Sequence, residues 1–180
     1  MTAAEASQAR AGGLWSLRVR LNALDLALYR RARSMARTPE SVRWVKRYSR
    51  LGEHGMLWFA LGAGGFALDA GHRRRWFRAT GTVGGAYVVS TSIKLAIGRK
   101  RPLVEDLPHL MATPTGLSFP SSHSTSSFAA ARAFGRLLPP GPLYAAASAM
   151  AFSRLYLGVH YPSDVAAGAA LGTVIGRVGR

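Results

Sequence analysis

The chain has 180 residues, enough for one domain with a buried core, and its 24 Lys and Arg against 8 Asp and Glu give a formal net charge of +16. Because 48% of the residues are hydrophobic, a disordered basic tail is excluded, and the lack of Cys excludes disulfide scaffolds, zinc–thiolate sites and thiol nucleophiles. The basic residues stand in short clusters between apolar runs, which is typical of a protein that crosses a membrane several times.

The N-terminal region, residues 1–50, holds nearly half of the basic residues. Leucines spaced by three and four between Leu14 and Leu28 mark one face of an amphipathic helix, with arginines between and after them. Such a helix suits an anionic membrane surface, and it equally suits packing on the rest of the chain or on a second copy, which would make a homo-oligomer. Pro39 at a first helical position predicts a second, short basic helix to about Arg50.

Five apolar segments follow, and we expect each of them to be a helix that spans the membrane, although none is an unbroken apolar run of about 20 residues. The expected spans are 55–70, 76–98, 120–138, 143–158 and 162–178, with a polar loop at 99–119. Gly168 and Gly172 have the spacing of a small-residue packing face. The predicted fold is all-α: a polytopic membrane helix bundle of about five transmembrane helices in residues 51–180, preceded by the basic amphipathic region in residues 1–50.

Polar residues stand at three points where a membrane helix normally excludes them. The first is Lys94, followed seven residues later by Arg101 and Pro102, so that about two helical turns would place both cations on one helix face. A cation inside a membrane helix costs about 2.5–3.5 kcal/mol on insertion scales, which makes Lys94 a functional candidate. Arg99 and Lys100 are interpreted as anchors that hold the helix end to lipid headgroups.

The second point is the sequence Pro120-Ser121-Ser122-His123 at the start of the third span. Proline fits the first helical turn, where free backbone N–H groups and the partial positive charge of the helix favour an anion. Ser121 and Ser122 would add hydroxyl donors, and His123 would supply a proton. The alternative is an ordinary Ser-rich helix cap with a His that faces the headgroups.

The third point is Ser153-Arg154, followed by His160 and Asp164. Pro162 starts the last helix, so that His160 lies just before this helix and Asp164 lies in its first turn. An Asp within reach of an imidazole can hold one tautomer of the ring and stabilise its positive form.

The three points should meet at one edge of the membrane, because successive spans run in opposite directions. Three cations (Lys94, Arg101 and Arg154) would then surround a helix N-terminus and two His, one of them paired with an Asp. Such a set is suited to holding a phosphate and transferring it. The sequence shows no cluster of carboxylates beside these residues, so we expect chemistry without a metal or a cofactor.

In three ordered motifs, the chain resembles the type 2 phosphatidic acid phosphatase family, lipid phosphate phosphatases that share a fold with bacterial acid phosphatases and vanadium haloperoxidases. The motifs are Lys94 to Arg101-Pro102, Pro120 to His123, and Ser153-Arg154 with His160 and Asp164. The resemblance covers about residues 55–180. Ser122 stands where the family usually has Gly.

The resemblance implies a role for each motif residue. His160 attacks phosphorus to form a phosphohistidine, Asp164 orients it, and His123 protonates the leaving alkoxide and then activates water. The phosphoryl oxygens are bound by the remaining residues, Lys94, Arg101, Ser121, Ser122 and Arg154. The implied function is metal-independent hydrolysis of a phosphate monoester or diphosphate on a membrane lipid, either a phospholipid or a polyprenyl type that includes prenyl-phosphoryl sugar phosphates.

Two other functions stay open: a non-enzymatic basic membrane adaptor, and a vanadate-dependent haloperoxidase, a class that is usually larger and soluble. Nucleic-acid binding is not expected, because the basic residues lie between apolar spans and not along one groove. The expected partners are a lipid phosphate substrate and anionic membrane lipids. The expected location is the cell membrane, multi-pass, with the active site on the cytoplasmic face, because more Lys and Arg lie on the side of the motifs.

Overall fold

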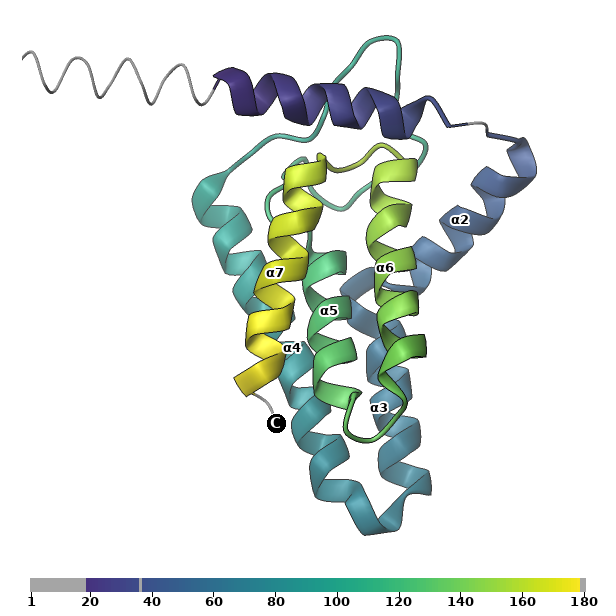
Figure 1. Ribbon diagram of the computed structural model, residues 1–180, viewed down its shortest axis with the longest axis vertical. Helices are drawn as coiled ribbons and strands as arrows, with labels where there is room; N and C mark the ends of the chain where they lie inside the picture. The colour runs from purple at the N-terminus through teal and green to yellow at the C-terminus, as the bar shows by residue number, and fades with distance from the viewer. Residues whose placement is uncertain (1–18, 36, 179–180) are drawn as a thin grey trace, which may run out of the picture.

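The computed structural model describes residues 19–35 and 37–178, so the start of the predicted N-terminal helix, Leu14 included, lies outside the described residues. The described part of the chain is helical and contains no β-strand, only one isolated bridge between Lys100 and Leu117. The predicted all-α fold is therefore confirmed. Residues 19–33 are helical and lie across one end of a bundle of longer helices (Figure 1).

Six α-helices follow in the described chain. They are α2 (Pro39–Leu51), α3 (Met56–Leu68), α4 (Arg73–Ile97), α5 (Ser122–Phe134), α6 (Pro140–Tyr156) and α7 (Pro162–Val178). The predicted start of α2 is confirmed: Pro39 fills its first turn, and the hydroxyl of Thr38 accepts a hydrogen bond from the backbone N–H of Ser41.

Three helix boundaries differ from the predicted spans by three residues or more. α4 already begins at Arg73, whose side chain donates to the carbonyl of Phe66 and so ties the end of α3 to the start of α4. α5 ends at Phe134, because the next residues turn back and donate to its carbonyl oxygen. α6 begins at Pro140, since a proline in a first turn removes no helical hydrogen bond.

Helix α5 is the centre of the bundle. Nine of its 13 residues are buried, and it packs against α4, α6 and α7, which surround it in Figure 1. Its small Ser and Ala side chains allow neighbouring helices to approach closely. The approach of α7 is so close that a Cβ at Gly172 would overlap the carbonyl oxygen of Thr125. Gly168 packs in the same way, which confirms the predicted small-residue face.

The N-terminal helix packs on the rest of the chain, which was one of the open alternatives. The face that it buries is polar and carries Asp25, Tyr29 and Arg33, whereas Leu21 and Leu24 are each 56% exposed. The leucine periodicity therefore marks the outer face of this helix, and its inner face is held by hydrogen bonds to the end of α6, the start of α7 and the loop between them.

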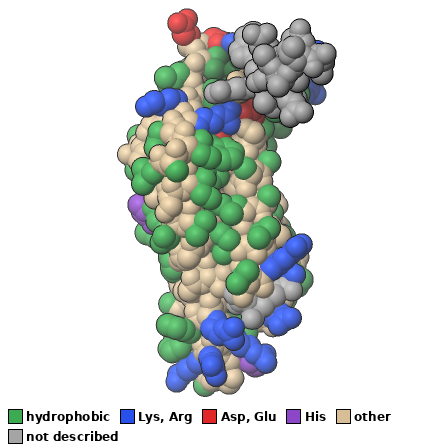
Figure 2. All heavy atoms as spheres, turned by 90° about the vertical axis from the view of Figure 1, so that its left-hand side faces the viewer, with side chains coloured by type: hydrophobic (Ala, Val, Ile, Leu, Met, Phe, Trp, Pro, Cys, Tyr) green, Lys and Arg blue, Asp and Glu red, His purple; other side chains and the backbone are tan. Residues whose placement is uncertain are grey.

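Large hydrophobic side chains are exposed on the outside of the bundle, among them Phe77, Val88 and Leu95 of α4 and Val174 of α7. Figure 2 shows hydrophobic side chains over the middle of one face and Lys and Arg gathered at its lower end. Among the described residues, no helix combines the length and the apolar composition that a membrane span needs. The number of five transmembrane helices therefore stays a prediction.

Candidate active site

A cavity of about 110 Å³ lies at the end of the bundle where α4 ends and α5 begins. Six of the eight predicted site residues line it, and they come from three helices and two loops. They are Lys94, Arg101, Ser122, His123, Arg154 and His160. Residues more than 60 positions apart in the sequence thus meet in one small space, as the three motifs predicted, while Ser121 and Asp164 lie behind its wall.

Arg101 reaches the cavity from a loop, and the predicted two helical turns between it and Lys94 are wrong. α4 ends at Ile97, with Gly98 in the left-handed conformation (φ 65°), so Lys94 is in the last turn and Arg101 lies beyond it. The guanidinium of Arg101 donates to the backbone carbonyls of Thr115 (2.8 Å) and Val159 (2.5 Å). These bonds fix Arg101 between the two loops that form the rim of the site.

The start of α5 is shifted by two residues from its predicted position, Pro120. Pro120 precedes the helix, Ser121 is its N-cap, and Ser122 is the first helical residue. The hydroxyl of Ser121 accepts from the N–H of Ser124 (3.4 Å), and the N–H of Ser121 donates to the carbonyl of Asp164 (3.0 Å). Ser121 therefore holds the two helices together behind the cavity, whereas Ser122 and His123 face it.

His160 has the tautomer that leaves a lone pair on Nε2. This nitrogen is 3.1 Å from NH1 of Arg101, and because a guanidinium can only donate, Nε2 accepts and the ring proton is on Nδ1. Nδ1 lies 3.5 Å from Oδ2 of Asp164, a longer approach than an ordinary hydrogen bond. The imidazole thus offers its nucleophilic nitrogen toward the cations and its proton toward the carboxylate.

The surroundings keep the ring of His160 neutral. Burial lowers the pKa of this imidazole well below its ordinary 6.5, and the positive charges of Arg101, Arg154 and Lys94 lower the pKa further. Burial also lowers the pKa of Arg101, to about 10, although Asp164 opposes this change. At neutral pH the site therefore combines a neutral imidazole with a charged guanidinium.

None of the three cations in the cavity forms an ion pair with a carboxylate in the described part of the chain. Arg154 is 2% exposed, and its NH1 donates to the hydroxyl of Ser49. Lys94 is 9% exposed and forms neither a hydrogen bond nor an ion pair with any described residue. A buried positive charge without a counter-ion is costly, and a phosphate dianion would supply the missing negative charge.

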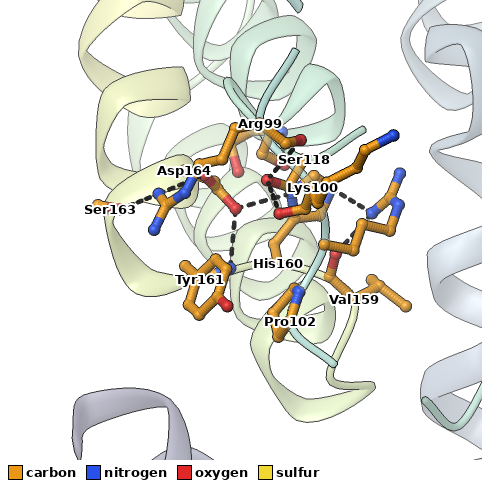
Figure 3. Close-up of polar contacts among 12 residues, drawn as sticks. Arg99, Lys100, Pro102, Ser118, Val159, His160, Tyr161, Ser163 and Asp164 are labelled. Carbon is orange, nitrogen blue, oxygen red and sulfur yellow. Dashed lines mark hydrogen bonds and ion pairs between the residues drawn. The ribbon is translucent and has the colours of Figure 1, made fainter. Parts of the chain in front are cut away.

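Two residues of the site were missed by the motif analysis. Arg99 is no headgroup anchor: its guanidinium bridges Asp164 (2.8 Å) and Asp25 of the N-terminal helix (2.6 Å). Figure 3 shows Arg99 extending to Asp164 and Ser163 at the start of α7, beside His160. Burial opposes the charge of Arg99, but its bonds to the two carboxylates prevail and raise its pKa. For Asp25, the sequence offered only one indication of a role, which is that it is an acid among the leucines of a basic helix.

Comparison with known proteins identifies the family of this chain. A family model described as the PAP2 superfamily matches residues 75–179. Decaprenylphosphoryl-5-phosphoribose phosphatase of Mycobacterium tuberculosis is 39% identical over an alignment of 139 residues, which covers 72% of this chain and 73% of that protein.

Two solved structures share the fold with a TM-score of 0.74 each. The crystal structure of Aquifex aeolicus LpxE is 27% identical and matches 87% of this chain and 94% of that one. The crystal structure of a transmembrane PAP2 type phosphatidylglycerolphosphate phosphatase from Bacillus subtilis is 21% identical and matches 89% and 84%. The resemblance and the enzyme class predicted from the sequence are thereby confirmed: the chain belongs to the PAP2 superfamily and is a lipid phosphatase.

Proposed function

We propose that this protein hydrolyses the terminal phosphate of a lipid phosphate through a phosphohistidine on His160, without a metal ion. The observation that carries the proposal is the neutral imidazole of His160, buried among three cations that line one cavity. A phosphate monoester that entered this cavity would offset two of the positive charges. The charge that grows on its oxygens in the transition state would be stabilised by the same groups, which is the largest contribution in most phosphoryl transfers.

In the first step, Nε2 of His160 forms a bond to phosphorus and the bond from phosphorus to the ester oxygen breaks. The leaving oxygen takes a proton from His123, whose ring lines the cavity and whose Nε2 has no hydrogen-bond partner among the described residues. The phosphorylated imidazole is a cation, and Asp164 beside Nδ1 offsets this charge. The present 3.5 Å separation would shorten as the charge develops.

In the second step, His123 takes a proton from water, and the water oxygen attacks phosphorus. The bond to Nε2 of His160 breaks, inorganic phosphate leaves, and both imidazoles return to their starting states. Ser122, in the place of the family's usual Gly, keeps the backbone N–H groups at the start of α5 next to the phosphoryl oxygens and adds a hydroxyl.

For the substrate we propose a prenyl-phosphoryl sugar phosphate, the type named for the mycobacterial relative. A second cavity of about 440 Å³ adjoins the first, and both are lined by Glu53 and Ala112. Lys46 and Arg50, one helical turn apart on α2, line this second cavity and form no ion pair within the described chain. These cations suit a phosphodiester, and Glu53 can accept hydrogen bonds from sugar hydroxyls between the two phosphates.

We also propose that the protein resides in the cell membrane. The exposed hydrophobic side chains around the bundle support this location, and the fold is shared with a transmembrane phosphatase. The catalytic cavity lies at one end of the bundle, at the depth where the headgroup of a lipid would sit. The cytoplasmic orientation and a homo-oligomer stay predictions.

The test is phosphate release by the detergent-purified protein in excess chelator. The panel contains a prenyl-phosphoryl pentose phosphate, a prenyl diphosphate and phosphatidate, and His160→Ala is compared with His72→Ala at the opposite end of the bundle. We expect release by the wild type and by His72→Ala and none by His160→Ala. Equal release by all three proteins, or release only after a metal is added, would contradict the mechanism. Silence of the wild type together with bromide oxidation in vanadate and peroxide would favour the haloperoxidase.

A further inference from the structure

We propose that Asp25 of the N-terminal helix is a positioning residue of the active site, acting through Arg99 on Asp164 and thereby on His160. This role rests on the function proposed above. It assigns to a helix outside the three motifs a part in catalysis, where the sequence had indicated only a membrane-surface or packing role.

A continuous chain of polar contacts leads from Asp25 to the nucleophile. Oδ2 of Asp25 is 2.6 Å from NH2 of Arg99, and NH1 of Arg99 is 2.8 Å from Oδ1 of Asp164. Oδ2 of Asp164 then faces Nδ1 of His160 at 3.5 Å. Asp25 is 7% exposed and Asp164 is fully buried, so water screens these charges little.

Asp25 also holds the turn that carries Asp164. Its Oδ1 accepts a hydrogen bond from the N–H of Ser163 (2.9 Å), and its Oδ2 accepts one from the hydroxyl of Ser163 (2.5 Å). Ser163 is in the first turn of α7, next to Asp164, where backbone N–H groups lack helical partners. Asp25 thus caps α7 from another helix, and the negative charge suits this helix end.

The rest of the inner face of the N-terminal helix contacts the end of α6 and the loop that follows it, which bears His160. Asp25, Tyr29 and Arg33 are spaced by four residues, so they share one face. The hydroxyl of Tyr29 donates to the carbonyl of Gly158 (3.2 Å), and NH1 of Arg33 donates to the carbonyl of Tyr156 (2.9 Å). The polar face of the helix therefore contacts the segment that bears His160, and its leucines are exposed.

The charge of Asp25 has a specific effect on the reaction. Two carboxylates around the single guanidinium of Arg99 leave one net negative charge beside His160. Without Asp25, Arg99 would neutralise Asp164, and the cationic phosphohistidine would lose its counter-charge. The cations that bind phosphate do not contact Asp25, so its loss should lower kcat and leave KM nearly unchanged.

The experiment compares Asp25→Asn with Asp106→Asn in the full-length protein. Asp106 is a matched control because this loop residue also forms an ion pair with the N-terminal helix, at Arg30. That pair is exposed and lies away from the cavity. We expect Asp25→Asn to lower kcat about tenfold, as for other groups that orient a functional histidine, with KM within about twofold. Asp106→Asn should match the wild type. Because Asp25 acts in large part through Arg99, the double variant with Arg99→Gln should lose clearly less kcat than the two single losses multiplied together.

Two results would overturn the role of Asp25: kcat of Asp25→Asn equal to that of Asp106→Asn, or losses that add in the double variant. If Asp25→Asn does not fold, Asp25→Glu and Arg99→Lys carry the test. Both keep their charge, but a lysine has a single nitrogen in place of the planar fork whose two nitrogens reach Asp25 and Asp164. Only Arg99→Lys should therefore lose kcat, and equal kcat in these two variants would overturn the role.

Binding of orthovanadate by calorimetry separates this role from the proposed function, because it needs no turnover. We expect the wild type and Asp106→Asn to bind orthovanadate. Asp25→Asn should bind it more weakly, because vanadate bonded to Nε2 of His160 makes the ring a cation that needs the same counter-charge as the phosphohistidine. A wild type that binds no vanadate and releases no phosphate would contradict the proposed function and this role with it. A wild type that does both, with Asp25→Asn unchanged in both assays, would contradict the role of Asp25 alone.

Discussion

Lys94 is the residue whose charge should favour phosphate binding while it lowers the free energy of unfolding. Its ammonium is almost fully enclosed, has no partner among the described residues and shares a cavity with Arg101 and Arg154. Met has nearly the same length and shape without the charge. Insertion scales give about 2.5–3.5 kcal/mol for burying a lysine, and because the cavity can hold water, we expect Lys94→Met to gain a smaller amount, about 1–2 kcal/mol.

For a chain of this size, such a gain raises the melting temperature by about 2–8 °C. The assay is thermal unfolding in detergent, followed by tryptophan fluorescence, with phosphate release measured in parallel. Lys94→Met should melt above the wild type and lose about 100-fold or more in kcat/KM, because a group that stabilises the transition-state charge is gone. The exposed Lys100, replaced by Met, is the control and should change neither quantity.

Orthovanadate adds a second comparison, because a ligand that binds only the folded state raises the melting temperature. It should stabilise the wild type more than Lys94→Met. A Lys94→Met protein that melts below the wild type would refute the argument that this charge is uncompensated. Full activity of that variant would refute its place in the phosphate site.

The remaining predictions concern pH, packing and substrate choice. Because folding lowers the pKa of His160, the unfolded chain binds a proton on this imidazole before the folded chain does as the pH falls. The free energy of unfolding should therefore be highest above pH 6.5 and decline below it. His160→Gln should flatten that decline in denaturant titrations. Gly172→Ala should cost about 1–3 kcal/mol of unfolding free energy through backbone overlap, whereas Gly85→Ala, with open space, should gain about 1 kcal/mol in the same titrations. Lys46→Ala should raise KM for a prenyl-phosphoryl sugar phosphate and leave KM for a prenyl monophosphate unchanged, while Arg43→Ala on the same helix should alter neither.

The motif residues could be predicted because their chemistry restricts the residue type. A buried lysine, a histidine followed four residues later by an aspartate and a serine-rich helix start are each unusual in an apolar chain. The structure brings most of them to one cavity. Arg101 is in a loop and not on the predicted helix face, but its side chain still lies in the predicted site.

Residues outside the motifs could not be predicted in the same way. Asp25 and Arg99 are 74 positions apart, and no spacing rule connects a helix to a distant loop. Leucine periodicity predicted the helix but not its polar inner face, because the carbonyl groups that Tyr29 and Arg33 contact lie more than 100 positions away in the sequence. Ser121 became the N-cap because the helix starts two residues later than predicted, and a proline is tolerated both before and inside a first helical turn.

The most direct test of the central claim is to trap the covalent intermediate. The wild type and His123→Ala are mixed with a lipid phosphate, denatured at alkaline pH, where phosphohistidine survives, and digested for mass spectrometry. Our account predicts phosphate on the peptide at His160 in the wild type, and a slower appearance of that peptide in His123→Ala, which lacks the acid of the first step. An unmodified His160 during turnover, or phosphate on another residue, would contradict it.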